Sequence, residues 1–337
     1  MEIPINTGKK HSITIEPGFF TRTEFPKGFV ITDNNLAMEY FHLFDNKGYY
    51  RVHAIKPGEK SKSLETYSKI LHELAEEVPS AIIAFGGGVV GDLAGYVAST
   101  CQRGLPLIQI PTSLMAMVDS SIGGKNGVNV GKIKNFAGRI YQPNHIFIDP
   151  DFLQTLPESE FENGLAEIIK YSYLFDSPSR NRLKKGVNKK DSDLTKIITE
   201  SVRKKVRVVE EDEYDKDKRH VLNAGHTIGH GIELLYGLSH GIAISIGMVT
   251  EAKLGRSYKG IIFEREIKSL VEMLEANNLP TNLREVAGQY ENIDVEKIIE
   301  IMKKDKKGAF NFAFSQEHTN VTLIEAQVRD FLEKEWN

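Results

Sequence analysis

The chain has 337 residues, of which 40 % are hydrophobic and 26 % are charged, and its formal net charge is −3. This is the composition of a globular protein of about two domains, and the weak charge argues against nucleic acid or a membrane surface as the main partner. The single cysteine, Cys101, excludes an intrachain disulfide and an all-cysteine zinc site. The sequence shows no secretory signal and no apolar run of about 18 residues, which predicts a cytoplasmic protein without a membrane span.

Residues 1–150 alternate short apolar runs with helical patterns. Apolar runs predict strands over 28–33, 51–55, 81–85, 105–110 and 145–148, and an apolar stripe at helical spacing predicts a helix over 63–77. The run at 81–85 is continuously apolar and ends in glycines, as buried parallel strands do. This alternation predicts an α/β domain with a Rossmann-like, mostly parallel sheet over residues 1–150.

The pattern changes after Pro150. Helical periodicity predicts helices over 158–175, 194–211, 221–236, 242–258, 262–277 and 295–304. The sequence therefore predicts a second, all-α domain over residues 151–337.

A glycine-rich segment, GGGVVGD at residues 86–92, follows the predicted strand over 81–85 and leads into a helical pattern. Glycines there let a phosphate approach the backbone, and the start of a helix offers oriented N–H donors. The G-x-G-x-x-G spacing alone is a weak signal, and no acidic residue stands at a strand end about 20 residues later. A tight turn without any ligand is the alternative interpretation.

Polar residues also gather at 111–125, after the predicted strand over 105–110. Asp119 and Lys125 flank a Ser-Ser and a Gly-Gly pair, and Lys134 and Asn135 follow. Such residues near glycines suit a phosphate or a polyhydroxylated ligand, but the segment alone would also fit a turn with surface charges.

Three of the ten histidines, His226, His230 and His240, lie within fifteen residues. His226 and His230 are four residues apart and share one face of a helix. Glu167 is flanked by Ile168 and Ile169, an unusual setting for a solvated acid. One carboxylate and two imidazoles form a common catalytic metal set. The alternatives are an acid/base site, a solvated helix face, and a surface ion pair of Glu167 with Lys170.

Together these motifs resemble the 3-dehydroquinate synthase family, within the wider group of sugar-phosphate cyclases. The resemblance extends from about Asp33 to Lys307. The motifs that match the family, in chain order, are Pro57 to Lys62, Gly86 to Asp92, Val118 to Lys125, Lys134 and Asn135, Ala166 to Lys170, Asn223 to His226 with His230, His240 with Gly241, and Asp305 to Lys307.

The resemblance implies NAD and a divalent metal, most often zinc and otherwise cobalt, bound in the cleft between the two domains. The implied metal ligands are Glu167, His226 and His240. The implied NAD-binding residues are Asp33, Asn35, Glu59, Lys62, Gly87, Gly88, Asp92, Thr112, Ser113, Lys134 and Thr155. The implied substrate-binding and catalytic residues are Arg103, Asp119, Lys125, Asn135, Lys170, Lys205, Arg219, Asn223, His230 and Lys306. Arg103 is expected to reach the other subunit of a homodimer.

The implied activity is that of a phosphate-eliminating lyase of the shikimate pathway, which leads to the aromatic amino acids. The substrate would be 3-deoxy-D-arabino-heptulosonate 7-phosphate. Transient oxidation at C5 by NAD would permit loss of phosphate, and reduction, ring opening and an aldol closure would give 3-dehydroquinate. Lys125, Asn135 and His230 would bind the phosphate, whereas Arg219 and Lys205 would bind the carboxylate.

Two other functions stay open at this stage. The first is a related cyclase that makes valiolone-type or inosose-type rings, because Ser113, Asn126 and Ala224 depart from the family's usual residues. The second is a metal-dependent polyol dehydrogenase of the glycerol dehydrogenase type, which shares the glycine-rich loop. Lys205, Arg219, Asn223 and Lys306 are retained, which favours a substrate that carries a carboxylate.

Overall fold

The structure is a computed structural model that describes residues 1–23, 28–45, 50–286, 293–305 and 310–336. The chain forms two compact units. Unit 1 comprises residues 1–157 and 192–213, and unit 2 comprises residues 158–191 and 214–337. The grouping of 192–213 with unit 1 was not expected from the sequence, and a domain boundary at residue 150 stays a prediction.

Unit 1 is built on a seven-stranded sheet in which every neighbouring pair is parallel except β1 and β2. Its order is β1-β2-β9-β6-β5-β3-β4. The strands are β1 (Glu2–Asn6), β2 (Lys10–Ile15), β3 (Gly28–Asp33), β4 (Tyr50–Ile55), β5 (Ile82–Gly86), β6 (Leu107–Pro111) and β9 (His145–Ile148). All residues of β5 and β6 are buried, because both faces of the sheet's centre are covered. The predicted Rossmann-like sheet is therefore confirmed.

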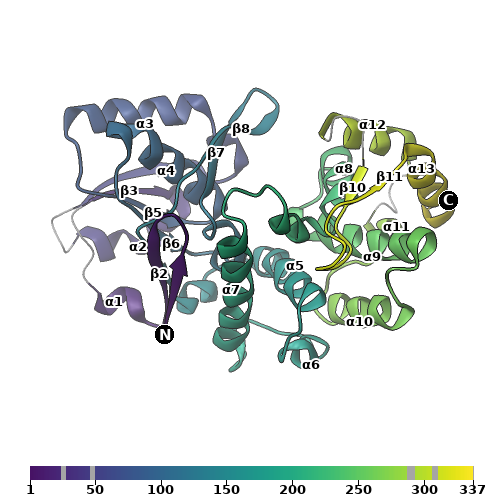
Figure 1. Cartoon of the computed structure of the whole chain (residues 1–337). Coiled ribbons are helices and arrows are strands. Elements are labelled where there is room, and N and C mark those ends of the chain that lie inside the picture. The colour runs from purple at the N-terminus through teal and green to yellow at the C-terminus, as the bar shows by residue number, and fades with distance from the viewer. Residues whose placement is uncertain (24–27, 46–49, 287–292, 306–309, 337) are drawn as a thin grey trace. The chain divides into compact units, whose positions relative to one another are not determined.

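Helices of unit 1 pack on this sheet, and Figure 1 shows α3 and α4 along one face. The helices are α1 (Phe19–Arg22), α2 (Asn34–Asp45), α3 (Leu64–Glu76), α4 (Gly88–Thr100) and α7 (Leu194–Glu211), with short helical turns η1 (Glu59–Ser61), η2 (Cys101–Arg103), η3 (Ala116–Ser120) and η4 (Pro150–Gln154). Ser63 caps α3 by accepting the Thr66 N–H at 3.2 Å, which fixes the start of that helix.

An antiparallel hairpin of β7 (Lys125–Val130) and β8 (Ile133–Ile140) was not expected from the sequence. β8 has no buried residue and so lacks the apolar alternation that marks a half-buried strand. β7 packs on α4, where Val128 is buried. Gly127 allows the two strands to meet, since a Cβ there would lie 3.0 Å from the Ala137 carbonyl oxygen.

The connections of the sheet reverse direction between β3 and β5. From β3 the chain moves outward to β4, whereas from β5 it moves the other way through β6 to β9. In open α/β sheets, ligands bind outside the carboxyl ends of the strands at such a switch point. Asp33 ends β3, and Gly86 ends β5 and precedes Gly87 and Gly88, so the topology places these predicted NAD-binding residues at that edge.

Unit 2 is helical, as predicted, with one small addition. Its helices are α5 (Glu158–Leu174), α6 (Arg180–Leu183), η5 (Lys218–Asn223), α8 (His226–Tyr236), α9 (His240–Lys259), α10 (Glu264–Glu275), α11 (Leu283–Val286), α12 (Val295–Asp305) and α13 (Glu325–Trp336). A two-stranded hairpin of β10 (Phe310–Phe312) and β11 (Val321–Leu323) joins them. Among the described helices, none has the length and apolar character that crossing a membrane requires.

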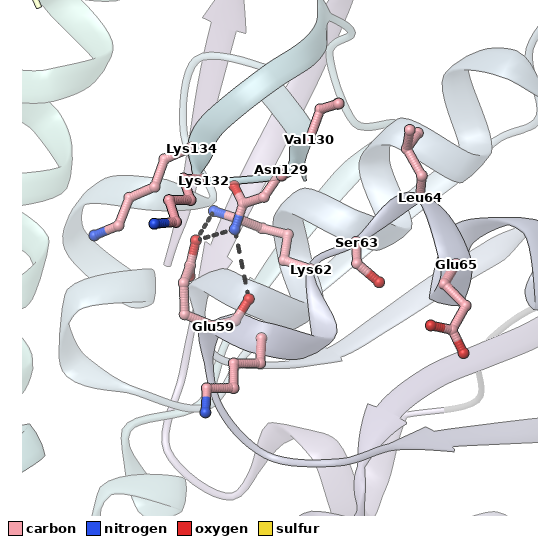
Figure 2. Close-up of a pocket in the computed structure, with 11 residues that line it drawn as sticks. Glu59, Lys62, Ser63, Leu64, Glu65, Asn129, Val130, Lys132 and Lys134 are labelled. Atoms are coloured by element: carbon pink, nitrogen blue, oxygen red, sulfur yellow. Dashed lines mark hydrogen bonds and ion pairs between the residues drawn. The ribbon is translucent and has the colours of Figure 1, made fainter.

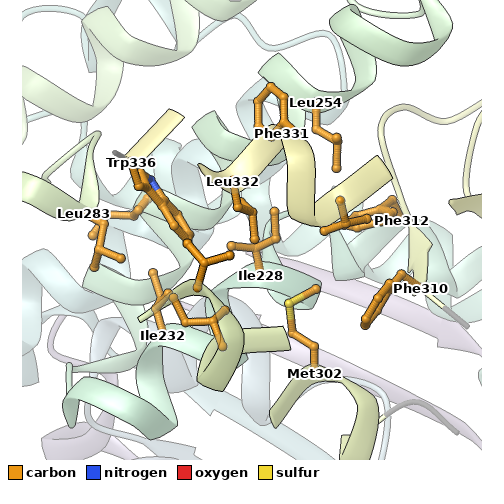
Figure 3. Packing of buried hydrophobic residues seen from close by; sticks show 14 of the residues in the cluster. Ile228, Ile232, Leu254, Leu283, Met302, Phe310, Phe312, Phe331, Leu332 and Trp336 are labelled. Carbon is orange, nitrogen blue, oxygen red and sulfur yellow. The ribbon is translucent and has the colours of Figure 1, made fainter. Parts of the chain in front are cut away.

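One apolar core holds unit 2 together. Ile228 and Ile232 of α8 pack with Met302, Leu332 and Trp336, all of which are at most 2 % exposed (Figure 3). Ile228 and Ile232 are four residues apart and so lie on one face of α8. The opposite face of α8 is thereby left for polar groups.

The predicted helix over 221–236 was wrong in one respect. The chain forms the 3-10 turn η5 up to Asn223, breaks at Ala224 and Gly225, and begins α8 at His226. Gly225 has φ of 81°, a left-handed conformation that glycine adopts without strain. His226 is thus the first residue of a helix.

Candidate active site

Three polar side chains share the face of α8 opposite the apolar core. His226, His230 and Glu233 stand at positions i, i+4 and i+7, which recur on one stripe of a helix. The ring centroids of His226 and His230 lie 5.2 Å apart, and that of His240, the first residue of α9, lies 5.3 Å from that of His226. The fold therefore brings the three predicted histidines together.

The imidazoles of His226 and His240 are each oriented by a hydrogen bond at Nδ1. Nδ1 of His226 lies 3.2 Å from the Ala224 carbonyl oxygen, and Nδ1 of His240 lies 3.1 Å from Glu233 Oε2. An Nδ1–H that donates to an oxygen leaves Nε2 with its lone pair free. Both Nε2 atoms therefore suit metal ligation.

Glu167 on α5 completes this cluster. Its Oε1 lies 3.9 Å from Nε2 of His226 and 3.5 Å from Nε2 of His240, while its Oε2 forms an ion pair with Lys170. The Glu167 side chain is 1 % exposed. One oxygen thus faces both histidines, and the other is held by a buried lysine.

The donor set fits a divalent cation. One ligand atom each from Glu167, His226 and His240 lies within 4.8 Å of the others. Ligand atoms about 2.1 Å from a tetrahedral zinc ion lie about 3.4 Å apart, close to the spacing seen here. Three protein ligands leave a fourth position for substrate or water, as catalytic zinc sites do.

The electrostatics of the cluster also favour a cation. Burial, and next the charge of Lys170, lower the pKa of His226 well below its usual range, so its ring is neutral at pH 7. Burial alone would lower the pKa of His240, but the carboxylates of Glu167 and Glu233 raise it to about 9. Positive charge is therefore stabilised beside these two carboxylates.

The start of α9 is fixed to α5 by a contact of Gly241. The Gly241 N–H donates to Oδ1 of Asn163, which lies one helical turn before Glu167 on α5. A Cβ on Gly241 would lie 2.4 Å from the Asn163 carbonyl oxygen, so only glycine fits. This contact holds His240 beside the helix that carries Glu167.

In unit 1, the start of α4 has the features of a phosphate-binding turn. Gly87 is its N-cap residue and has no side chain that could accept the first N–H groups of the helix. A Cβ at Gly87 would lie 3.3 Å from Ser113 Oγ, and one at Gly88 would lie 3.0 Å from Ser120 Oγ. The glycines thus keep open a polar space at the positive end of a helix, which fits the pyrophosphate of NAD.

Predicted NAD-binding residues also line a pocket of about 500 Å³ beside β7 and β8 (Figure 2). Lys62 lies 3.1 Å from Glu59 and 3.0 Å from Asp92, and Asn129 donates to Glu59 at 2.8 Å. Burial raises the pKa of Asp92 to about 6, although the charge of Lys62 opposes this shift.

The lining of this pocket carries more positive than negative charge. Four lysines, Lys60, Lys62, Lys132 and Lys134, line it together with two glutamates. The side chains of Lys132 and Lys134 extend toward the same side of the pocket in Figure 2. This charge suits an anionic ligand such as a nucleotide phosphate.

The other predicted NAD-binding residues take the following places. Asp33 accepts the N–H groups of Asn35 and Leu36 at 2.9 and 3.1 Å and so caps α2. Thr112 donates its N–H to the Gly86 carbonyl oxygen, which joins the ends of β6 and β5. The Thr155 hydroxyl lies 2.8 Å from that of Tyr40.

Unit 1 also holds five of the predicted substrate-binding residues. Lys205 on α7 is 5 % exposed and pairs with the Asp119 carboxylate in η3. Lys125 begins β7 and is exposed. Arg103 and Asn135 have φ of 63° and 52°, a region that few residues other than glycine occupy, and both side chains are exposed.

Unit 2 holds the remaining predicted substrate-binding residues that the structure describes. Arg219 and Asn223 lie in η5, which contacts α5, and Arg219 is 3 % exposed. Lys170 is 2 % exposed. Lys306 lies outside the described residues.

Three residues that the sequence interpretation missed contribute to these sites: Glu233, Asn163 and Asn129. The i+7 spacing of Glu233 from His226, and the i−4 spacing of Asn163 from Glu167, are the signals that could have found the first two. Asn129 gave no signal, because its role depends on a hairpin that was not predicted.

Comparison with known proteins agrees with this description. Family models described as the N-terminal and C-terminal parts of 3-dehydroquinate synthase match residues 52–163 and 164–308. A 3-dehydroquinate synthase of Streptococcus pyogenes serotype M6 is 41 % identical over 289 residues, covering 83 % of this chain and 79 % of its own. One from Caldanaerobacter subterraneus subsp. tengcongensis is 38 % identical over 322 residues, covering 91 % and 89 %.

Solved structures with the same fold include two other cyclases. A 2-deoxy-scyllo-inosose synthase in complex with carbaglucose-6-phosphate, NAD+ and Co2+ has a TM-score of 0.86 at 23 % identity, covering 99 % of this chain and 100 % of its own. The 2-epi-5-epi-valiolone synthase ValA of Streptomyces hygroscopicus subsp. jinggangensis, with NAD+ and Zn2+ bound, has a TM-score of 0.82 at 22 % identity, covering 96 % of each chain.

Proposed function

Because the chain belongs to the 3-dehydroquinate synthase family, we propose that it converts 3-deoxy-D-arabino-heptulosonate 7-phosphate to 3-dehydroquinate and phosphate. The observation that carries this proposal is the cluster of Glu167, His226 and His240, whose three ligand atoms lie close together. The reaction belongs to the shikimate pathway, and its place in the cell is the cytoplasm.

When bound, NAD would supply reversible hydride transfer at C5, and a divalent cation would polarise the C5 oxygen. Glu167, His226 and His240 of unit 2 would hold that cation. Lys170 forms an ion pair with the second carboxylate oxygen of Glu167. Zinc is the proposed metal, with cobalt as a substitute.

The residues of unit 1 hold NAD. The N–H groups at the start of α4 and the glycines beside them receive the pyrophosphate, because they combine free donors with space. Lys62 and Asp92 position the nucleotide beside the pocket, and Lys134 adds positive charge to its rim. Asp33, Asn35, Glu59, Thr112, Ser113 and Thr155 complete the proposed NAD-binding set.

The substrate is recognised through its phosphate, hydroxyl and carboxylate groups. His230, Lys125 and Asn135 are assigned to the phosphate, and Arg219 with Lys205 to the carboxylate, where a guanidinium can donate two parallel hydrogen bonds. Asp119, Lys170, Asn223 and Lys306 complete the set. Arg103, held exposed with a positive φ, is assigned to the active site of the second subunit in a homodimer.

The assay that tests this proposal measures phosphate release from the heptulosonate phosphate in the presence of NAD and zinc. We expect one phosphate and one dehydroquinate per substrate, with no net change of absorbance at 340 nm. Glucose 6-phosphate, which lacks the carboxylate, serves as the comparison substrate. Phosphate release from glucose 6-phosphate alone would indicate a sister cyclase, and net NADH formation would indicate a polyol dehydrogenase.

A further inference from the structure

The start of α8 is held by a carboxylate that does not face the metal cluster. Glu251 on α9 accepts the Gly225 N–H with Oε2 at 2.8 Å and the Ile228 N–H with Oε1 at 2.9 Å. It is 2 % exposed. These two N–H groups stand on either side of His226 in the chain.

Glu251 provides hydrogen-bond acceptors for N–H groups that have no acceptor within α8. The first N–H groups of a helix have no partner within it, and the N-cap residue usually accepts one with its side chain. Gly225 is the N-cap residue of α8 and has no such side chain. A carboxylate at this end also interacts favourably with the positive end of the helix dipole.

Close packing of α8 against α9 brings Glu251 within reach. A Cβ on Gly247 would lie 2.1 Å from the Gly225 carbonyl oxygen, and one on Gly225 would lie 2.5 Å from Met248 Cγ. Glycines at both positions let the backbones touch. Glu251 follows Gly247 by four residues, so it lies one turn further on the same face of α9.

The same helix begins with His240, eleven residues or about three turns before Glu251. α9 therefore carries one predicted metal ligand at its start and fixes the backbone around another, His226, through Glu251. We propose that Glu251 is a positioning residue that sets the place of the His226 imidazole in the cation site. This inference rests on the cation site of the proposed function.

The test is cation affinity, measured without substrate or turnover. Glu251→Gln keeps the size of the side chain, but the amide nitrogen cannot accept, so one of the two N–H groups loses its partner. We expect the variant to bind Co2+ at least about tenfold more weakly than the parent, with a changed d–d absorption spectrum. Glu251→Asp, which is too short to reach both N–H groups, should show the same loss.

Ser245→Ala is the matched control for a loss of stability alone. Ser245 lies on α9, is fully buried, and donates to the carbonyl oxygens of Ile242 and Pro280, but has no contact with α8 among its hydrogen bonds. We expect Ser245→Ala to lower the thermal midpoint of the metal-free protein about as much as Glu251→Gln does, while its cation affinity stays within twofold of the parent.

Parental affinity and spectrum in Glu251→Gln would overturn the inference, as would an equal loss of affinity in Ser245→Ala. A parent that binds no cation would overturn it as well. Because the readout is binding, the inference can hold even if the phosphate assay rejects dehydroquinate as product.

Discussion

In unit 2 the charged groups of the site are fixed by residues outside the ligand set, whereas in unit 1 they are fixed by one another. The Ala224 carbonyl oxygen and the Glu233 carboxylate lie within hydrogen-bond distance of Nδ1 of His226 and His240, and both Nε2 atoms face Oε1 of Glu167. In unit 1, Lys62 pairs with Asp92 and Lys205 pairs with Asp119. The groups that orient the histidines are thus already in place in unit 2, while Lys62 and Lys205 of unit 1 are each paired with a carboxylate.

This difference predicts where a substitution acts. Removing a ligand or its supporting group in unit 2 should lower cation affinity with little other effect. Removing a lysine in unit 1 should leave a carboxylate without its partner and lower the stability of the fold. Three substitutions test this contrast, and a fourth, at Gly87, tests the site assigned to NAD; they follow in order of expected size.

His226→Ala should have the largest effect, because it removes one of three metal ligands. We expect loss of the bound metal after dialysis and a fall in kcat/KM of about 1000-fold, since metal polarisation is worth several kcal/mol. Metal content by atomic absorption and the phosphate assay measure the two effects. Full retention of metal would show that the ligands were assigned wrongly.

Glu233→Ala should weaken cation binding by about 10- to 100-fold, because it removes the acceptor that orients His240. Glu233→Gln is the matched variant, since its amide oxygen can still accept from Nδ1, and its loss should be smaller. Titration with zinc against a chelating indicator measures both. Equal zinc affinities in Glu233→Ala and the parent would contradict the view that residues outside the ligand set fix the ligands in unit 2.

Lys62→Met should destabilise the protein by about 2 kcal/mol at pH 8, because the Asp92 carboxylate, 18 % exposed, loses its partner. The pKa of Asp92 is raised to about 6 in the folded chain. Its favourable contribution to the free energy of unfolding is therefore complete below the pKa that Asp92 has in the unfolded chain, and it is lost as pH rises through 6. Losing Lys62 raises that pKa further, so the penalty should be small at pH 5.

Thermal midpoints of the parent and Lys62→Met at pH 5 and pH 8 measure this difference. Lys69→Met is the control, because Lys69 pairs with Glu65 on an exposed helix face, and such pairs contribute at most about 1 kcal/mol. A penalty for Lys62→Met that does not change with pH would contradict the role given to Asp92.

Gly87→Ala should have the smallest effect on the fold and a clear effect on NAD. Its φ of −76° is open to alanine, and the new methyl group would lie 3.3 Å from Ser113 Oγ, in the space assigned to the pyrophosphate. We expect about tenfold weaker NAD binding by calorimetry with a thermal midpoint close to that of the parent. Unchanged NAD affinity would place the pyrophosphate elsewhere.

Much of the fold follows from the order of apolar patterns. The continuous apolar run before Gly86 predicted a buried parallel strand, and β5 is that strand. The hairpin of β7 and β8 escaped prediction because β8 has no apolar alternation, and its place is set by packing of β7 on α4. The alternation of apolar and polar residues arises because one face of a strand is buried. A strand with no buried residue therefore shows no such alternation in its sequence.

The candidate site shows the same limit. The types and spacing of His226, His230 and His240 predicted a cluster, and the fold brings them together. The supporting residues Glu233 and Glu251 are glutamates in helices, and glutamate is common on solvated helix faces, so residue type alone does not distinguish them. Their roles depend on which helix faces which, and tertiary packing decides that.

X-ray diffraction from zinc-loaded crystals at the zinc absorption edge tests the central claim most directly. The account predicts one strong anomalous peak about 2.0 to 2.2 Å from Oε1 of Glu167 and from Nε2 of both His226 and His240. No peak at this position, or zinc bound instead through His230 and Glu233, would contradict it.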